Sequence, residues 1–190
     1  QNWLLPISTF DNATNISIIK LSETSERAIL LLKDKTAQLW DIQLGIKLGE
    51  LPGVIDAEFN PKTSTLLTFS EDHTVRIWNA INGSALGEIM RLPMQILEAK
   101  FSPDGEKILT SSVDKTVRLW DAGTGKSLDK YFNHRGPIFK AEFSPDSTQM
   151  LTVSQDNHPG IFDHVTLLDV NTGKKTWGQI SQITLNQNVI

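Results

Sequence analysis

Short apolar runs separated by turn residues extend along the whole chain, and apolar residues do not recur at helical spacing. The segment 116–121 reads Thr-Val-Arg-Leu-Trp-Asp, so polar and apolar residues alternate along it. Alternation with a period of two is typical of a β-strand with two different faces. Pro103 removes a backbone donor before this region and Gly105 permits positive φ, which predicts a turn. We therefore predict an all-β chain.

The third stretch of the chain shows the pattern most clearly, with strands predicted at 95–102, 107–113, 115–122 and 126–132. Tight turns between them predict one four-stranded antiparallel sheet. Three further stretches follow the same plan. Their predicted strands cover 16–22, 28–33, 36–42 and 46–51, then 54–60, 65–70, 73–80 and 84–90, and finally 137–144 and 149–155.

Two markers repeat with each unit. A tryptophan lies near the end of the third strand in three units, and a Phe or Leu lies 19 residues before it: Leu21 with Trp40, Phe59 with Trp78, and Phe101 with Trp120. The first marker recurs at Phe143, so successive units begin 38, 42 and 42 residues apart. A period of about 40 with four strands per unit is typical of β-propeller blades. Such a blade buries its apolar faces only against neighbouring blades.

The repeats divide residues 1–190 into units at about 15–52, 53–92, 93–133 and 134–180, with an extra terminal strand expected at 181–190. The fourth unit diverges from the others. It has 12 residues from Asp156 to Leu168 where the third has 6 from Asp114 to Trp120, and Leu168 replaces the tryptophan. We expect the inserted residues 157–162 to lengthen a hairpin.

Composition excludes several classes of protein. Hydrophobic residues make up 39% of the chain and charged residues 21%, as in ordinary globular domains. A net charge of −4 without basic clusters disfavours nucleic-acid binding. No run approaches the roughly 18 apolar residues of a membrane span, and no leader is visible, so we expect a cytoplasmic protein without membrane contact. The absence of cysteine excludes disulfides and thiolate metal sites.

The sequence gives only weak evidence for a catalytic site or a metal-binding site. His134, Ser154 and Asp156 could form a triad, but no oxyanion donors or glycine-flanked elbow accompany Ser154. His158, Asp163 and His164 of the fourth unit's insertion could contact a metal, but two histidines on a loop with Pro159 and Gly160 are weak evidence for a rigid site. We therefore predict no catalytic residue, no metal and no cofactor.

Two segments of the third unit carry a family resemblance. Residues 101–105 read Phe-Ser-Pro-Asp-Gly, and residues 112–121 read Ser-Val-Asp-Lys-Thr-Val-Arg-Leu-Trp-Asp. On these residues the chain resembles the WD-repeat (WD-40) β-propeller family, with bacterial-type repeats, over about 16–180. Propellers of this family usually close with about seven blades. Four units therefore imply an open arc or part of a larger propeller, and a closed four-bladed propeller is the alternative.

The resemblance also implies a stabilising hydrogen-bonded network in each blade. Its members are the tryptophan, a Ser or Thr of the second strand, an Asp of the following turn and a His before the first strand. The matching residues are Trp40 and Asp34; Trp78, Ser70 and Asp72; Trp120, Ser112 and Asp114; and His134, Ser154 and Asp156. Because no unit has all four members, we expect weaker individual blades.

A break in the alternation recurs four residues before each Phe or Leu marker, at Ser17, Ile55, Leu97 and Phe139. Each follows an apolar residue, so strict alternation fails there, which predicts a bulge that redirects a side chain. The resemblance places these positions near the mouth of a central channel, where partners dock. The candidate partner-binding residues are Ile55, Leu97, Phe139, Lys33, Glu71, Val113 and Gln155. The alternative is that the apolar column only packs between blades.

These observations together favour a non-catalytic scaffold or sensor module that binds a protein or peptide. An apolar ring with charges around it suits such a partner. The bacterial resemblance implies a part of a larger signalling or regulatory protein. Two alternatives are a propeller-based hydrolase or lyase, and a structural segment that pairs with further blades of the same or another chain.

Overall fold

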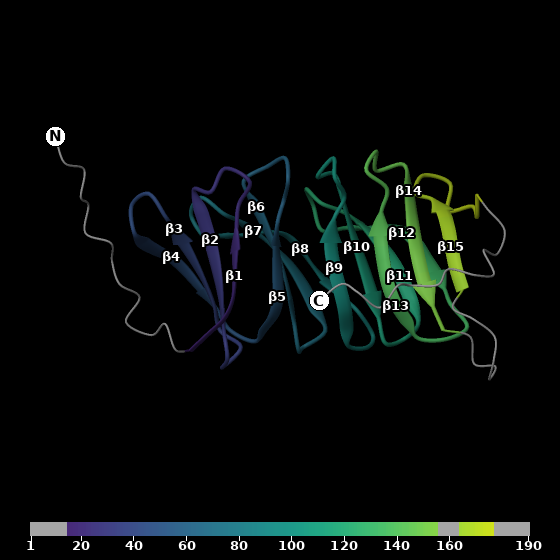
Figure 1. Ribbon diagram of the computed structural model, residues 1–190, viewed down its shortest axis with the longest axis horizontal. Helices are drawn as coiled ribbons and strands as arrows, with labels where there is room; N and C mark the ends of the chain where they lie inside the picture. Colours follow the sequence, from purple (N-terminus) through teal and green to yellow (C-terminus); the bar gives the residue numbers. More distant parts are fainter. Residues whose placement is uncertain (1–14, 156–163, 177–190) are drawn as a thin grey trace, which may run out of the picture.

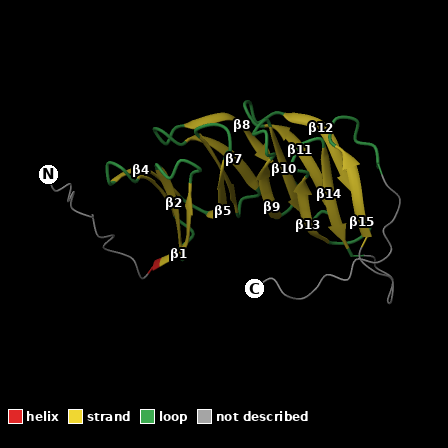
Figure 2. Ribbon diagram, turned by 45° about the horizontal axis from the view of Figure 1, so that its top comes forward, coloured by secondary structure: helices red, strands yellow, loops and turns green. Residues whose placement is uncertain are grey.

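A computed structural model describes residues 15–155 and 164–176 (Figure 1). These residues form strands joined by turns (Figure 2), which confirms the all-β prediction. Each strand predicted between residues 16 and 155 is present, with its ends within one residue of the prediction. The segments 157–162 and 181–190, with the expected hairpin extension and terminal strand, lie outside the described residues.

The strands form four antiparallel sheets, and within each sheet neighbouring strands follow chain order. The first sheet contains β1 (Ile16–Leu21), β2 (Arg27–Leu32), β3 (Ala37–Asp41) and β4 (Ile46–Leu51). The second contains β5 (Val54–Phe59), β6 (Thr65–Ser70), β7 (Thr74–Asn79) and β8 (Ala85–Arg91). The third contains β9 (Ile96–Phe101), β10 (Lys107–Ser112), β11 (Thr116–Asp121) and β12 (Ser127–Asn133).

The fourth sheet contains β13 (Ile138–Phe143), β14 (Gln149–Ser154) and β15 (His164–Asp169). An isolated antiparallel bridge joins Leu168 of β15 to Lys175. This bridge occupies the place that the fourth strand has in the other three sheets.

The sheets lie side by side in chain order and do not close into a ring (Figure 1). The first strands of neighbouring sheets, β1, β5, β9 and β13, contact one another along the row. An open arc of blade-like sheets is therefore the observed architecture, and the closed four-bladed alternative is wrong for the described residues. Among these residues, no helix is long and apolar enough to cross a membrane.

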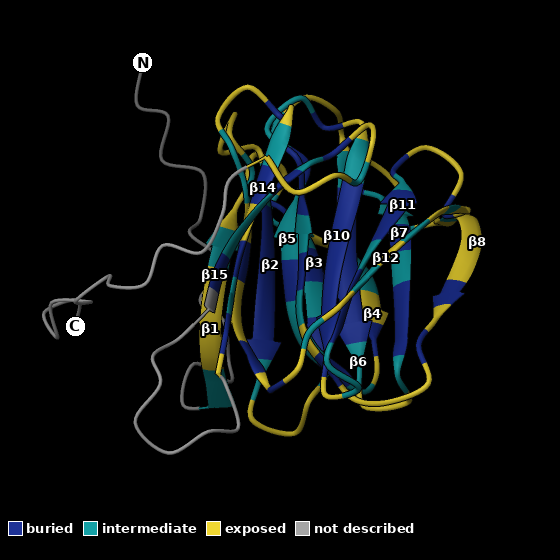
Figure 3. Ribbon diagram, turned by 90° about the vertical axis from the view of Figure 1, so that its right-hand side faces the viewer, coloured by how far each residue is buried: buried dark blue, intermediate teal, exposed yellow. Residues whose placement is uncertain are grey.

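The hydrophobic core lies between sheets and forms three clusters, one at each sheet–sheet boundary. In the first three sheets the second strands, β2, β6 and β10, are the most buried elements, as Figure 3 shows for β2 and β10. Ile29, Leu67 and Leu109 occupy one equivalent position in three of these strands and are 0%, 1% and 0% exposed. An apolar run buried on both faces is what a strand between two packed neighbours requires.

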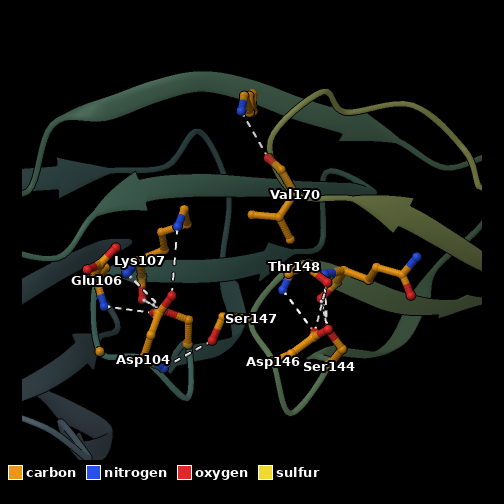
Figure 4. Close-up of polar contacts among 12 residues, drawn as sticks. Asp104, Glu106, Lys107, Ser144, Asp146, Ser147, Thr148 and Val170 are labelled. Carbon is orange, nitrogen blue, oxygen red and sulfur yellow. Dashed lines mark hydrogen bonds and ion pairs between the residues drawn. The ribbon is translucent and has the colours of Figure 1, made fainter.

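Side chains stabilise the turns that join first and second strands (Figure 4). The Ser102 hydroxyl donates to Asp104 Oδ1 and accepts the Lys107 backbone N–H at 2.9 Å. In the fourth sheet the Ser144 hydroxyl likewise donates to Asp146 Oδ1 at 2.6 Å. Hydrogen bonds from Ser144 and Thr148 hold the pKa of Asp146 below its ordinary value. These local bonds explain why a Ser-Pro-Asp sequence recurs at this turn.

Candidate functional site

Each first strand carries a bulge at the predicted position. The register with the second strand shifts between Ile16 and Ile18, between Val54 and Asp56, and between Ile138 and Lys140. In the third sheet, Ser111 pairs with Glu98 and Ser112 pairs with Ile96. The residues left without a cross-strand partner are Ser17, Ile55, Leu97 and Phe139. A bulge releases these side chains from the regular alternation of the strand.

A repeated backbone hydrogen bond brings the second set of candidate residues beside the bulges. The N–H groups of Lys33, Glu71, Val113 and Gln155 each donate to the carbonyl two residues before a bulge, at 2.9, 3.3, 3.0 and 2.9 Å. The acceptors are Asn15, Gly53, Gln95 and Pro137. Both sets therefore lie along one edge of the arc. We call Ile55, Leu97, Phe139, Lys33, Glu71, Val113 and Gln155 the binding rim.

The apolar residues of the binding rim differ in exposure. Phe139 is 57% exposed, Val113 49% and Leu97 39%. Ile55 is partly buried and packs against the core cluster between the second and third sheets. The alternative that the column packs between sheets thus applies in part to Ile55, whereas Leu97 and Phe139 present apolar surface to solvent.

Charged residues of the first strands follow the bulges directly. Asp56 follows Ile55, and its Oδ1 forms a 2.6 Å ion pair with the Nζ of Lys20 in the neighbouring sheet. Lys100 lies 3.2 Å from Glu98 and 3.6 Å from Glu142, so it links the third and fourth sheets. The Lys20–Asp56 and Lys100–Glu142 pairs cross sheet boundaries, whereas Glu98 and Lys100 belong to the same strand. All three pairs are part-exposed, so each contributes only about 0–1 kcal/mol.

Glu58 is the most perturbed acid among the described residues. Burial raises the pKa of its carboxyl to about 7, and the nearby Lys100 and Lys20 ammonium groups partly oppose this rise. A carboxylate in a poorly hydrated place favours its neutral form. Glu58 therefore changes charge near neutral pH on the same strand as the bulge at Ile55.

A cleft of about 450 Å³ opens beside Glu71. It lies between the segment 51–54, which joins the first and second sheets, and the residues Thr68, Ser70, Asp72, Arg76 and Trp78. The structure thus brings the rim residue Glu71 together with three predicted network residues, Ser70, Asp72 and Trp78, around one cavity.

The tryptophan network differs from the prediction. The Trp78 indole N–H donates to Thr68 Oγ1 at 2.9 Å, and Trp120 donates to Thr110 Oγ1 at 2.9 Å. The threonine two residues before Ser70 or Ser112 therefore fills the role assigned to that serine. The Ser112 hydroxyl instead donates to the backbone carbonyls of Met94 and Gln95.

Strand register explains the difference. Trp120 lies opposite Ile108, and Thr110 is the next residue of β10 on the same face. Ser112 is two residues further along, at about 3.3 Å per residue, beyond the reach of the indole. Thr68 and Thr110 each lie ten residues before a tryptophan. The strand pairing places this position on the same sheet face as the tryptophan, two residues along from the residue opposite it.

The outer units lack this pair. Leu30 occupies the threonine position in the first sheet, and the Trp40 N–H donates to Gln38 Oε1 at 3.3 Å. The fourth sheet keeps Thr152 but has Leu168, and the Thr152 hydroxyl donates only a long bond of 3.5 Å to the Thr166 carbonyl.

The predicted network aspartates serve their own turns. Asp34 accepts the Thr36 backbone N–H at 3.0 Å. Asp72 accepts both the backbone N–H and the hydroxyl of Thr74, and the hydroxyl bond lowers the pKa of Asp72. Asp114 accepts the backbone N–H and the hydroxyl of Thr116 and also forms a 3.0 Å ion pair with Arg118. In the described residues these contacts close the second turn rather than reach a tryptophan.

The catalytic interpretation gains no support. Ser154 is only 2% exposed, and the buried Nε2 of His134 has no hydrogen-bond partner within the described part of the chain. Burial, with a smaller effect of Lys175, lowers the pKa of His134. Asp156 lies outside the described residues, as do His158 and Asp163. Over 15–155 and 164–176, no three His, Asp or Glu side chains are grouped so that they could hold a metal ion.

Comparison with known families agrees with the geometry. The family described as WD domain, G-beta repeat matches residues 47–79 and 93–121. The matched residues run from the end of the first sheet through β7 and from the start of the third sheet through β11. No curated protein matches the chain.

Proposed function

The chain contains WD40 repeats, and on this basis we propose that it is a non-catalytic scaffold or sensor module that binds a protein or peptide at the binding rim. WD40 domains commonly bind proteins. The observation that carries the proposal is the bulge in every first strand, which points a side chain out of the sheet at one repeated place.

The chemistry of the rim suits an extended peptide with apolar side chains. Leu97, Val113 and Phe139 supply exposed apolar surface, and Lys33 and Glu71 supply charges beside it. Fully burying a large apolar side chain contributes about 1.5–3 kcal/mol. Leu97, Val113 and Phe139 would each contribute the part of this free energy that belongs to their exposed surface, and the charges select orientation and partner.

The cleft beside Glu71 gives the proposed partner a place to insert one side chain. It is lined by Trp78 and Val54 together with Arg76 and Asp72. Concave sites with an apolar wall and a few polar groups are typical of ligand recognition. A partner that lies along the rim would pass this cleft between the first and second sheets.

Peptide selection on the immobilised chain tests the proposal. A random peptide display library is selected against the chain, and the affinity of each selected peptide is measured by fluorescence anisotropy. We expect a Leu97→Glu/Phe139→Glu variant to lose at least tenfold in affinity. Ile81→Glu is the matched control, because Ile81 is a 56% exposed apolar residue in the turn after β7, away from the rim.

Unchanged affinity in the rim variant would contradict binding at the rim. An equal loss of affinity in the rim variant and in the Ile81→Glu control would contradict it as well. Thermal unfolding of each variant checks that the fold is intact. Because both rim side chains are already exposed, their replacement should leave the unfolding midpoint close to that of the unmodified chain.

A further inference from the structure

The three sheet–sheet boundaries share one plan. One sheet contributes its second, third and fourth strands, which we call its leading face. The next sheet contributes residues of its first, second and third strands, which we call its trailing face. In the boundary between the third and fourth sheets, Leu109 and Leu119 of the leading face meet Ala141, Met150 and Leu168 of the trailing face.

Trailing-face residues are buried in every sheet that has a preceding neighbour. The alanines two residues before the Phe marker, Ala57, Ala99 and Ala141, are 3%, 6% and 0% exposed. The residues two positions after the tryptophan or its replacement, Ala80, Ala122 and Val170, are 2%, 5% and 0% exposed.

The trailing face of the first sheet has no neighbour among the described residues, yet it is apolar at each of these positions. Ile19 is 56% exposed, Leu21 55% and Ile42 44%. Trp40 is half-buried, as is Trp78 of the second sheet, whereas Trp120 is 7% exposed, so the tryptophan position alone does not distinguish the free face. An exposed face with these residues is complementary to a leading face.

Within the described residues, the fourth sheet presents the second- and third-strand part of a leading face. Leu151 is 37% exposed, whereas the equivalent Ile29, Leu67 and Leu109 are 0%, 1% and 0% exposed. Leu167 is half-buried, whereas the equivalent Leu39, Ile77 and Leu119 are at most 1% exposed. Val153 is also half-buried on this face. The two ends of the arc thus present the two unpaired halves of an interface that the chain already contains three times.

Polar features agree with the same pairing. At the boundary between the third and fourth sheets, Lys100 and Glu142 occupy equivalent positions and form an ion pair of 3.6 Å. The equivalent residue is Glu142 in the fourth sheet and Lys20 in the first sheet, and these two residues have opposite charges. A fourth-sheet to first-sheet contact would therefore bring an acid and a base together.

Backbone geometry agrees as well. The glycines of the turns after the third strands, Gly83, Gly125 and Gly173, have φ of 73°, 73° and 69°, and a Cβ added at each would approach the preceding sheet at Leu48, Glu88 or Phe132. Gly45 has φ of 66° in the corresponding turn of the first sheet. The first sheet therefore keeps the turn geometry that its three counterparts place against a neighbour.

From these observations we propose that a second copy of the chain docks head to tail, with the fourth sheet of one copy against the first sheet of the other. A head-to-tail contact closes into a ring when its rotation permits. Two copies supply twice four sheets, which lies within the range of about four to eight blades that propellers use. This inference is independent of the proposed function, because the binding rim lies along the edge of the arc and not on its end faces.

Analytical ultracentrifugation of the whole chain over a concentration series tests the proposal. We expect a monomer–dimer equilibrium. Ile19→Asp and Leu151→Asp should each raise the dimer dissociation constant at least a hundredfold, since each removes one half of the interface from every copy. An equimolar mixture of the two variants should again form a one-to-one complex, because each still carries the half that the other lacks.

Ile81→Asp and Ile89→Asp are the controls, with 56% and 40% exposure outside both end faces, and both should dimerise like the unmodified chain. Circular dichroism melting establishes that all variants are folded. A chain that stays monomeric at the highest concentration overturns the proposal, as blades from another segment would then have to cover the ends. Dimers that survive in either single variant, or a mixture that does not associate, overturn the head-to-tail arrangement.

Discussion

The Trp120 indole N–H and the Thr110 hydroxyl form a 2.9 Å hydrogen bond across the third sheet, where both side chains are buried. The bond joins β10 and β11 on the face that packs against the second sheet. Within the described residues, Trp78 and Thr68 repeat it once, in the second sheet. The two inner sheets therefore share a polar contact that the outer sheets lack.

Thr110→Val should destabilise the protein by about 1–3 kcal/mol, because it leaves the buried indole N–H without an acceptor while nearly preserving volume. Thr152→Val is the matched variant in the fourth sheet, where Leu168 faces the threonine position and no indole needs an acceptor. Its cost should be below about 1 kcal/mol. The free energy of unfolding in urea measures both changes. Equal costs for the two variants would mean that the indole contact contributes nothing.

Stability should depend on Glu58 between pH 4.5 and about 7. The folded pKa of this acid lies above its unfolded value, so the unfolded state loses the proton first as pH rises. Glu58 therefore lowers the free energy of unfolding progressively from pH 4.5 to about 7, by on the order of 1–3 kcal/mol, with no further loss above.

The Glu58→Gln variant should lose this part of the pH dependence, which urea unfolding at pH 5 and pH 8 measures. His134 acts in the opposite direction, since its lowered pKa reduces stability as pH falls below about 6.5. The difference between the variant and the unmodified chain isolates Glu58. A difference that is the same at both pH values would contradict a raised pKa.

Gly125→Ala should destabilise the chain more than Gly53→Ala. Both glycines have positive φ, at 73° and 71°, so alanine costs about 1–2 kcal/mol at either position. A Cβ at Gly125 would in addition lie 2.4 Å from the Glu88 backbone oxygen, whereas a Cβ at Gly53 meets nothing within 4 Å. We expect a further loss of about 1–3 kcal/mol at Gly125. Thermal unfolding with calorimetry compares the two variants, and equal losses would indicate that the second and third sheets are free to separate here.

Arg27→Met should cost far more than Lys35→Met, although both cations link the first and second sheets. The Arg27 side chain is 17% exposed, pairs with the buried Asp41 at 3.0 Å and donates to the Ala80 carbonyl at 3.1 Å. Its removal leaves the buried Asp41 carboxylate with the Leu44 N–H at 2.8 Å but without a cationic partner, and breaking a buried ion pair in this way typically costs about 3–5 kcal/mol. Lys35 pairs with Glu71 in solvent, so its loss should cost less than about 1 kcal/mol. Chemical denaturation at low and high salt measures both, and a salt-sensitive Arg27 contribution would contradict its shielding.

The sequence predicts the strands well because each one spans only five to seven residues between strong turn signals. Pro103, Gly105 and the aspartates of the turns limit each strand to within one residue. The bulges could also be predicted, since two successive apolar residues at the start of a strand are incompatible with a single buried face. Leu97 is exposed directly after Ile96, which is 2% exposed.

The partners of the tryptophans could not be read from motif spacing alone. Ser112 and Thr110 are both hydroxyl residues on the same face of β10, and only the pairing of Trp120 with Ile108 decides between them. The sequence also could not predict the partial burial of Ile55, because this burial results from the packing of the third sheet against the second. Whether neighbouring units close into a ring depends on sheet–sheet rotation, which a linear pattern does not encode.

The bulge in each first strand has a consequence for how such a surface changes over evolutionary time. A bulged side chain has no residue opposite it in the adjacent strand, so its replacement disturbs no cross-strand pair. Leu97 and Phe139 are therefore free to diverge while Ile96 and Ile138 hold the core. Under the proposed function, selectivity for a partner can thus be altered at Leu97 or Phe139 without a change in the core.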